Sequence, residues 1–129
     1  MDRGKDWLEQ AERDLRFALS SLEDGYHEWT CFISQQAAEK AVKSLGENLK
    51  REYWGHSVRK ILVDLSAVME IPENLIEKGA VLDRYYIPAR YPNGFETGAP
   101  KDYFFGKDAE EAVAYAGEII EFCKGAVSR

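Results

Sequence analysis

The sequence is poor in the residues from which most metal and nucleotide motifs are built. Its histidines are His27 and His56 and its cysteines, Cys31 and Cys123, lie far apart, so a zinc site is not expected. The ten glycines are scattered and form neither a phosphate-binding loop nor a dinucleotide fingerprint. Metalloprotease and serine-hydrolase motifs are also missing. We therefore expect no metal and no cofactor, with both cysteines serving as small buried apolar residues.

Long apolar runs and an excess of positive charge are lacking as well. No stretch approaches the ~20 apolar residues of a membrane span, and the first five residues lead into no signal-type stretch, so we expect a cytoplasmic protein without membrane contact. The net charge of −6 argues against a general affinity for nucleic acid. A local basic patch would draw on Lys43, Lys50, Arg51, Arg84, Arg90 and Lys101.

Strand-like alternation of β-branched residues is absent, whereas apolar residues recur at helical spacing along the chain. The predicted helices cover about 6–23, 27–50, 57–69, 72–87 and 108–127; Asp24-Gly25 ends the first, Ser57 caps the third and Asp108 with Glu111 opens the fifth. The apolar arc of the second helix is wide enough to contact several neighbours, so this helix should be central. We predict an all-α, up-and-down bundle of five helices in a single domain, 1–129, with a long loop between helices four and five.

That loop runs from Tyr85 to about Gly106, and its length and aromatic content predict an ordered segment closing over a site. Arg90 follows Pro88, and its guanidinium suits bidentate binding of a phosphate. Tyr91 and Phe95 could stack on a base. In the alternative interpretation Arg90 pairs with Asp83 or Asp102, and the aromatic side chains only cover the core.

A polar stripe on the second helix is the other candidate feature, and it consists of Gln35, Gln36, Glu39, Lys40 and Lys43, with Phe32 among them. The stripe is either a solvated helix face or a face toward the Arg90 loop, where Glu39 would orient Lys43 or an arginine and the cations would hold a phosphate. Phe32 is either a scattered exposed residue or part of a subunit contact. His56 is either a helix-start residue bonded to the backbone or a general acid or base.

Four segments together resemble the HEPN family (higher eukaryotes and prokaryotes nucleotide-binding domain). They are Phe32–Lys43 with its Gln-Gln-Ala-Ala-Glu-Lys run, Gly55-His56-Ser57, Ala89-Arg90-Tyr91-Pro92, and Asp108–Ala112. The resemblance implies a helical bundle that dimerises, often encoded beside a minimal nucleotidyltransferase and also found in toxin–antitoxin pairs. It maps the family's Glu-x-x-x-Lys pair to Glu39 and Lys43 and its arginine to Arg90.

Many HEPN proteins are metal-independent ribonucleases in which a histidine follows the arginine after four to six residues. No histidine follows Arg90 anywhere in this chain. The resemblance therefore favours a non-catalytic homodimer that binds a nucleotide or phosphorylated ligand beside a nucleotidyltransferase subunit. The expected ligand-binding residues are Arg90, Tyr91, Glu39, Lys43, Gln36, Lys40 and Lys101. A ribonuclease toxin that uses Arg90 and His56 as catalytic residues is the alternative, in which RNA is the substrate.

Overall fold

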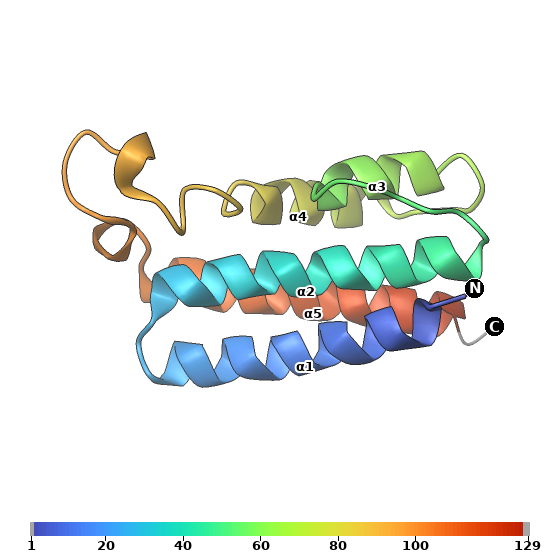
Figure 1. Ribbon diagram of the computed structural model, residues 1–129, viewed down its shortest axis with the longest axis horizontal. Coiled ribbons are helices and arrows are strands. Elements are labelled where there is room, and N and C mark those ends of the chain that lie inside the picture. Colours follow the sequence, from blue (N-terminus) through green and yellow to red (C-terminus); the bar gives the residue numbers. More distant parts are fainter. Residues whose placement is uncertain (1, 128–129) are drawn as a thin grey trace.

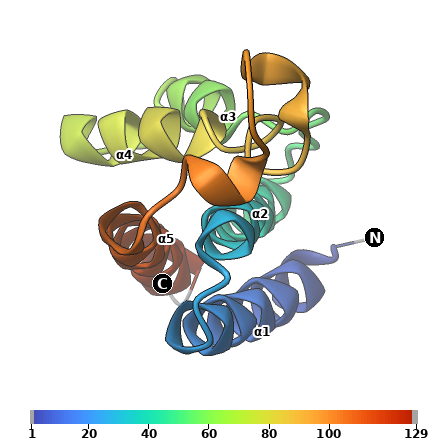
Figure 2. The ribbon, with the colours of Figure 1, turned by 90° about the vertical axis from the view of Figure 1, so that its left-hand side faces the viewer.

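Helix α2 lies at the centre of a bundle in which every other long helix contacts it (Figures 1 and 2). The computed structural model describes residues 2–127, and within that range it contains five α-helices and no strand. The helices are α1 (Gly4–Glu23), α2 (His27–Asn48), α3 (Val58–Leu65), α4 (Glu73–Asp83) and α5 (Gly106–Val127), with two 3₁₀ turns, η1 (Pro92–Gly94) and η2 (Pro100–Asp102). The predicted fold class and the central position of the second helix are confirmed.

Helices α1, α2 and α5 lie side by side, and the shorter α3 and α4 cover another side of α2 (Figure 2). Small residues line the contact faces, and Ala11, Ala37, Ala38, Ala41, Ala112 and Ala116 have no exposed surface. Leucine and isoleucine side chains fill the space toward α3 and α4. Cys31 and Cys123 are fully buried, as predicted. Burial raises the pKa of each thiol to about 12, because a thiolate is disfavoured in an apolar environment.

The connection between α1 and α2 is as tight as the Asp24-Gly25 signal predicts. Gly25 has a φ of +83°, a left-handed conformation that favours glycine. The connection after α2 is different, because residues 49–57 run back along α2 before α3 begins (Figure 1). Gly46 allows this return, since a Cβ there would lie 2.7 Å from the Tyr53 ring. The returning segment places His56 beside the middle of α2.

Several predicted helix ends are wrong by a few residues. α2 ends at Asn48 and α3 at Leu65, because hydrogen bonds of the i→i+3 type tighten the chain after each helix. α4 ends at Asp83 instead of reaching Pro88, and residues 84–90 form a chain of turns. α5 begins at Gly106, where the Asp108 carboxylate accepts the Phe105 N–H at 2.9 Å. Asp108 is therefore the third residue of the helix and reaches back to its start, whereas Glu111 is exposed.

Candidate functional site

The polar stripe of α2 is largely buried, so its interpretation as a solvated face is wrong. Gln35 has no exposed surface and Glu39 only 5%. Buried polar groups need hydrogen-bond partners, and both side chains have several. They join α2 to the returning segment 49–57 and to the end of α4.

Asp83, the last residue of α4, fixes one end of this network. Its carboxylate accepts hydrogen bonds from the Gln35 amide at 3.1 Å, the Ser57 hydroxyl at 2.9 Å, and the backbone N–H groups of Val58 and Arg59 at 2.9 and 3.0 Å. A carboxylate at the first turn of α3 also meets the positive end of that helix. Asp83 is thus the acidic cap of α3, and the predicted alternative in which it pairs with Arg90 is wrong.

Glu39 fixes the other end of the network. Its carboxylate accepts from Lys43 Nζ at 3.0 Å and from Gln36 Nε2 at 3.2 Å, and it lies 3.2 Å from His56 Nδ1. The Lys43 and Glu39 side chains are 12% and 7% exposed, whereas the His56 side chain is 57% exposed. The carboxylate therefore orients both a lysine and a histidine, and the imidazole stays accessible to solvent.

Arg90 lies at the end of the turns that follow α4, and its guanidinium is enclosed by aromatic rings. Nε donates to the Tyr86 carbonyl at 2.8 Å. The guanidinium carbon lies 4.4 Å from the Phe32 ring centre, 4.6 Å from that of Tyr86 and 5.0 Å from that of Tyr91. Within residues 2–127 no carboxylate pairs with it, so the alternative of an Arg90–Asp102 pair is also wrong. The half-buried positive charge is held by π faces and by one carbonyl.

Tyr86 connects Arg90 with the Glu39 network. The His56 ring stacks on the Tyr86 ring with centroids 4.7 Å apart and an interplanar angle of 19°. Since the same tyrosine ring carries the Arg90 guanidinium, Arg90 and the pair Glu39–Lys43 lie on one side of the protein, joined through Tyr86 and His56. Sequence reasoning missed Tyr86 as a site residue. Its position four residues before Arg90, on a helical turn, is the signal that could have identified it.

The remaining predicted site residues are placed differently. Lys40 pairs with Asp14 of α1, and Lys101 pairs with its neighbour Asp102 at 3.1 Å. The Ala99 N–H and then Lys101 lower the pKa of the Asp102 carboxyl. Phe95 stacks face to face on Tyr103 at 4.1 Å, so its ring belongs to the small aromatic cluster of the loop. Of the predicted loop residues, Arg90 and Tyr91 are the two that meet.

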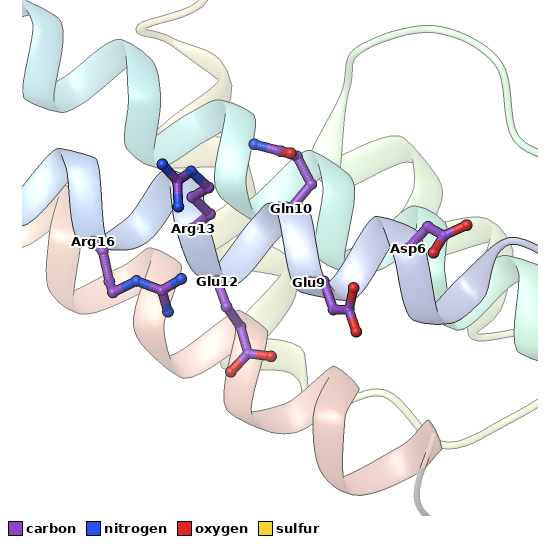
Figure 3. A pocket seen from close by; sticks show the side chains of 6 residues that line it. All are labelled: Asp6, Glu9, Gln10, Glu12, Arg13 and Arg16. Carbon is purple, nitrogen blue, oxygen red and sulfur yellow. The ribbon is translucent and has the colours of Figure 1, made fainter.

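The surface has a wide hollow elsewhere, but its chemistry is that of a solvated helix. It measures about 560 Å³ and is lined by Asp6, Glu9, Gln10, Glu12, Arg13 and Arg16. Figure 3 shows that all six side chains come from the single helix α1. No second element supplies a facing wall, so we assign no site there. Among residues 2–127 no group of His, Cys, Asp or Glu side chains is arranged to hold a metal, and no helix is long and apolar enough to cross a membrane.

Comparisons with known proteins agree with the helical architecture. The model of the HEPN domain family matches residues 5–126. TT1696 from Thermus thermophilus, a solved structure, is 43% identical, with a TM-score of 0.94 over 98% of this chain and 99% of that one. ST0689, described as an archaeal HEPN homologue, is 38% identical, with a TM-score of 0.83 over 98% of this chain and 99% of that one.

Two further relatives carry names that bear on function. An HEPN domain protein from Thermotoga maritima is 38% identical, with a TM-score of 0.79 over 96% of this chain and 98% of that one. A protein of Methanocaldococcus jannaschii named "Putative toxin MJ1304" is 28% identical over an alignment of 127 positions that covers 92% of this chain and 84% of that protein.

Proposed function

Because the chain belongs to the HEPN domain family, we propose that it is a homodimeric binding module for a nucleotide or another phosphorylated ligand. In this proposal it works beside a minimal nucleotidyltransferase subunit, in a toxin–antitoxin-like pair or as a substrate-binding subunit, and has no catalytic activity of its own. The relative named as a toxin supports the toxin–antitoxin setting.

The observation that carries the proposal is the uncompensated guanidinium of Arg90. A half-buried charge is costly unless something neutralises it. Here three aromatic rings and one carbonyl hold the guanidinium, and no carboxylate within residues 2–127 does so. The Nη groups remain as donors in the fork geometry that matches two phosphate oxygens. An anionic ligand would supply the missing negative charge.

The residues around Arg90 would contribute to ligand binding to different degrees. Tyr91, which is 47% exposed, offers a ring beside the arginine on which a base could stack. Glu39, which also accepts from Gln36, holds Lys43 and His56 on the other side of the network, where Lys43 adds positive charge and hydrogen-bond donors. Lys40 and Lys101 would contribute only if their pairs with Asp14 and Asp102 open.

Thermal shift with nucleotides tests the proposal. At a ligand concentration of 100 times Kd, binding to the folded state stabilises it by about 2.7 kcal/mol. We expect nucleotides to raise the melting temperature of the wild type and to have no effect on Arg90→Ala. Arg84→Ala is the matched control, because Arg84 is exposed and lies in the same chain of turns. No shift for the wild type at millimolar nucleotide, or an equal shift in Arg90→Ala, would contradict the proposal.

The proposed assembly needs its own measurement. Light scattering of the purified chain is expected to give the mass of a dimer, twice 14.7 kDa. Affinity purification from its native cells is expected to recover a nucleotidyltransferase subunit. A monomer in solution, together with no recovered nucleotidyltransferase, would refute the proposed assembly.

One observation favours the alternative function, a metal-independent ribonuclease. His56 shares the Tyr86 ring with Arg90, its Nδ1 lies 3.2 Å from Glu39, and its side chain is 57% exposed. An imidazole oriented by a carboxylate is a common arrangement for proton transfer. In that function His56 Nε2 would take the proton of a ribose 2′-hydroxyl as its oxygen attacks phosphorus, while Arg90 holds the non-bridging phosphate oxygens. The bond between phosphorus and the 5′-oxygen of the next nucleotide would break, and that oxygen would leave as a hydroxyl after taking a proton from water.

RNA cleavage in the presence of a chelator separates the two functions. If the chain is a ribonuclease, it cleaves RNA without metal, and Arg90→Ala and His56→Ala each abolish the cleavage. If it is only a binding module, the wild type leaves RNA intact while nucleotide binding still depends on Arg90.

A further inference from the structure

A second cleft lies beyond Lys43, on the side of α2 that faces the start of α1. One part of it, about 170 Å³, is lined by Trp7, Lys43, Glu47, Glu52, Tyr53 and Trp54. An adjoining part of about 480 Å³ shares Trp7, Glu47 and Glu52. Trp54 is 83% exposed, which is unusual for so large an apolar side chain. Two indole rings and the Tyr53 ring thus border a hollow whose remaining lining residues, apart from Gln10, are charged.

The charges in this cleft restrict the ligand that it can take. The Lys43 ammonium lies 5.5 Å from the centre of the Trp7 ring, so a second cation there would be repelled. The side-chain carboxylates of Glu47 and Glu52 have no ion-pair or hydrogen-bond partner within residues 2–127, although Lys50 and Arg51 border a neighbouring hollow with them. The other charged residues that line the larger part are already paired, Arg3 with Asp6 and Lys40 with Asp14. Two unpaired carboxylates disfavour an anion. The cleft therefore suits a neutral aromatic ring.

Hydrogen bonding narrows the choice of ring. A carboxylate accepts two adjacent donors, and guanine presents its N1–H and N2–H groups side by side. Adenine and cytosine place a ring-nitrogen acceptor beside their amino groups, and uracil places its N–H between two carbonyl oxygens. A lysine ammonium is also a good donor to guanine O6. Stacking on an exposed tryptophan is tolerant of base identity, so the polar groups decide the preference.

The cleft and the Arg90 site are joined but separated by more than one nucleotide. Lys43 contacts Glu39 of the Arg90 network and also lies over Trp7. Along α2, Phe32 at the Arg90 end and Lys43 at the cleft are 11 positions apart, or about 16 Å at 1.5 Å per residue. A nucleoside monophosphate is shorter than this, so a ligand that occupies both places must be longer, as a strand of two or more nucleotides is.

We propose that the Trp7–Trp54 cleft is a base-binding subsite selective for guanine, and that it serves a ligand of two or more nucleotides whose phosphate lies at Arg90. The second part of this proposal rests on the proposed function of Arg90. The first part does not.

The test uses short fluorescent tetranucleotides with 2′-O-methyl sugars, which cannot be cleaved through a 2′-hydroxyl. Fluorescence anisotropy compares UUUU with UUUG, GUUU, UUUA and AUUU, so that the guanine is offered at either end. We expect one of the guanine-containing strands to bind about tenfold more tightly than UUUU, with no gain from adenine. Trp54→Ala and Glu52→Gln should remove this gain. Phe17→Ala, which removes an exposed aromatic ring of α1 that does not line the cleft, should leave the gain from guanine unchanged.

The outcomes separate the subsite from the Arg90 site. Arg90→Ala should weaken every tetranucleotide equally, and its failure to do so would count against the Arg90 site alone. Guanosine, which has no phosphate, tests the cleft alone, because it should quench tryptophan fluorescence more than adenosine does, and Trp54→Ala should remove the difference. Equal quenching by both nucleosides, or a guanine preference that persists in Trp54→Ala, would overturn the proposed subsite.

Discussion

Replacing Asp83 is the sharpest test of how the site is held together. Its carboxylate accepts four hydrogen bonds, two of them from the first backbone N–H groups of α3. Asp83→Ala removes a helix cap, which costs about 1 kcal/mol. It also removes one of the two acceptors of the Gln35 amide, a fully buried group, at a cost of roughly 1–3 kcal/mol. We therefore expect Asp83→Ala to lower the free energy of unfolding by about 2–4 kcal/mol.

The isosteric change Asp83→Asn should lower the free energy of unfolding less than Asp83→Ala does, because the new amide can still satisfy most of the donors that face the Asp83 carboxylate. If the new amide nitrogen takes the position of Oδ2, it can donate to the Ser57 hydroxyl, and only the Arg59 N–H faces another donor. In the opposite orientation it would face two donors, Gln35 and Val58. One unpaired, solvent-accessible N–H costs about 1 kcal/mol, so Asp83→Asn should lie between the wild type and Asp83→Ala.

Chemical denaturation followed by far-UV circular dichroism measures these differences. For a chain of 129 residues, a loss of about 3 kcal/mol lowers the melting temperature by about 10 °C. Asp64→Ala is the control, because its exposed i,i+4 pair with Lys60 is worth only about 0.3–0.5 kcal/mol. If the Asp83→Ala variant were as stable as the Asp64→Ala control, the conclusion that Asp83 stabilises the network would be refuted.

Three further predictions concern the core. Gly117→Ala should raise the melting temperature, because a Cβ there meets no atom closer than 4.0 Å and alanine is favoured over glycine in a helix by about 1 kcal/mol. Gly79→Ala should lower the melting temperature, because its Cβ would lie 2.9 Å from a side-chain carbon of α3. Thiol reagents at neutral pH should label neither Cys31 nor Cys123 in the folded protein and both after denaturation; rapid labelling of the native protein would contradict their burial. Burial raises the pKa of Tyr85 from 10.0 to about 12 and that of both thiols from 9.0 to about 12. The folded state therefore holds these protons more tightly than the unfolded state, so the contribution of these three groups to stability is constant below about pH 9 and is lost as the pH rises from there to about pH 12. Denaturation curves at several pH values between about 8 and about 12 should show this loss.

The helices were predictable from the sequence because each has an apolar face with helical spacing, and the central position of α2 followed from the width of its apolar arc. The helix ends were less predictable. The turn that ends α4 depends on Asp83, whose carboxylate is engaged with residues far away in the chain. A local pattern of apolar residues contains no information about such a partner.

The candidate site was likewise predictable in its charged residues and not in the contacts that join them. Arg90, Glu39 and Lys43 were recognised as chemically distinctive, and the alternative in which the polar face of α2 turns toward the Arg90 loop agrees with the arrangement of the network. That their cations hold one phosphate stays a prediction. What joins them was not predictable. Tyr86 has no charge and no motif of its own, and the return of residues 49–57 along α2 that brings His56 to Glu39 leaves no periodic signal.

The pattern of hydrogen bonds explains why the charge of Arg90 is left over. Asp83 and Glu39 are the carboxylates of the network, and each is already committed: Asp83 to four donors, Glu39 to Lys43, Gln36 and His56. Turning either carboxylate toward Arg90 would leave buried donors without an acceptor. The free-energy cost of those unsatisfied donors is larger than the stabilisation from an ion pair with a half-exposed arginine. The fold thus keeps its own anions away from the guanidinium while aromatic rings hold it in place. An arginine kept fixed and unneutralised in this way is pre-organised for an anion from outside the chain, and this is the physical basis of the proposal that it binds a ligand.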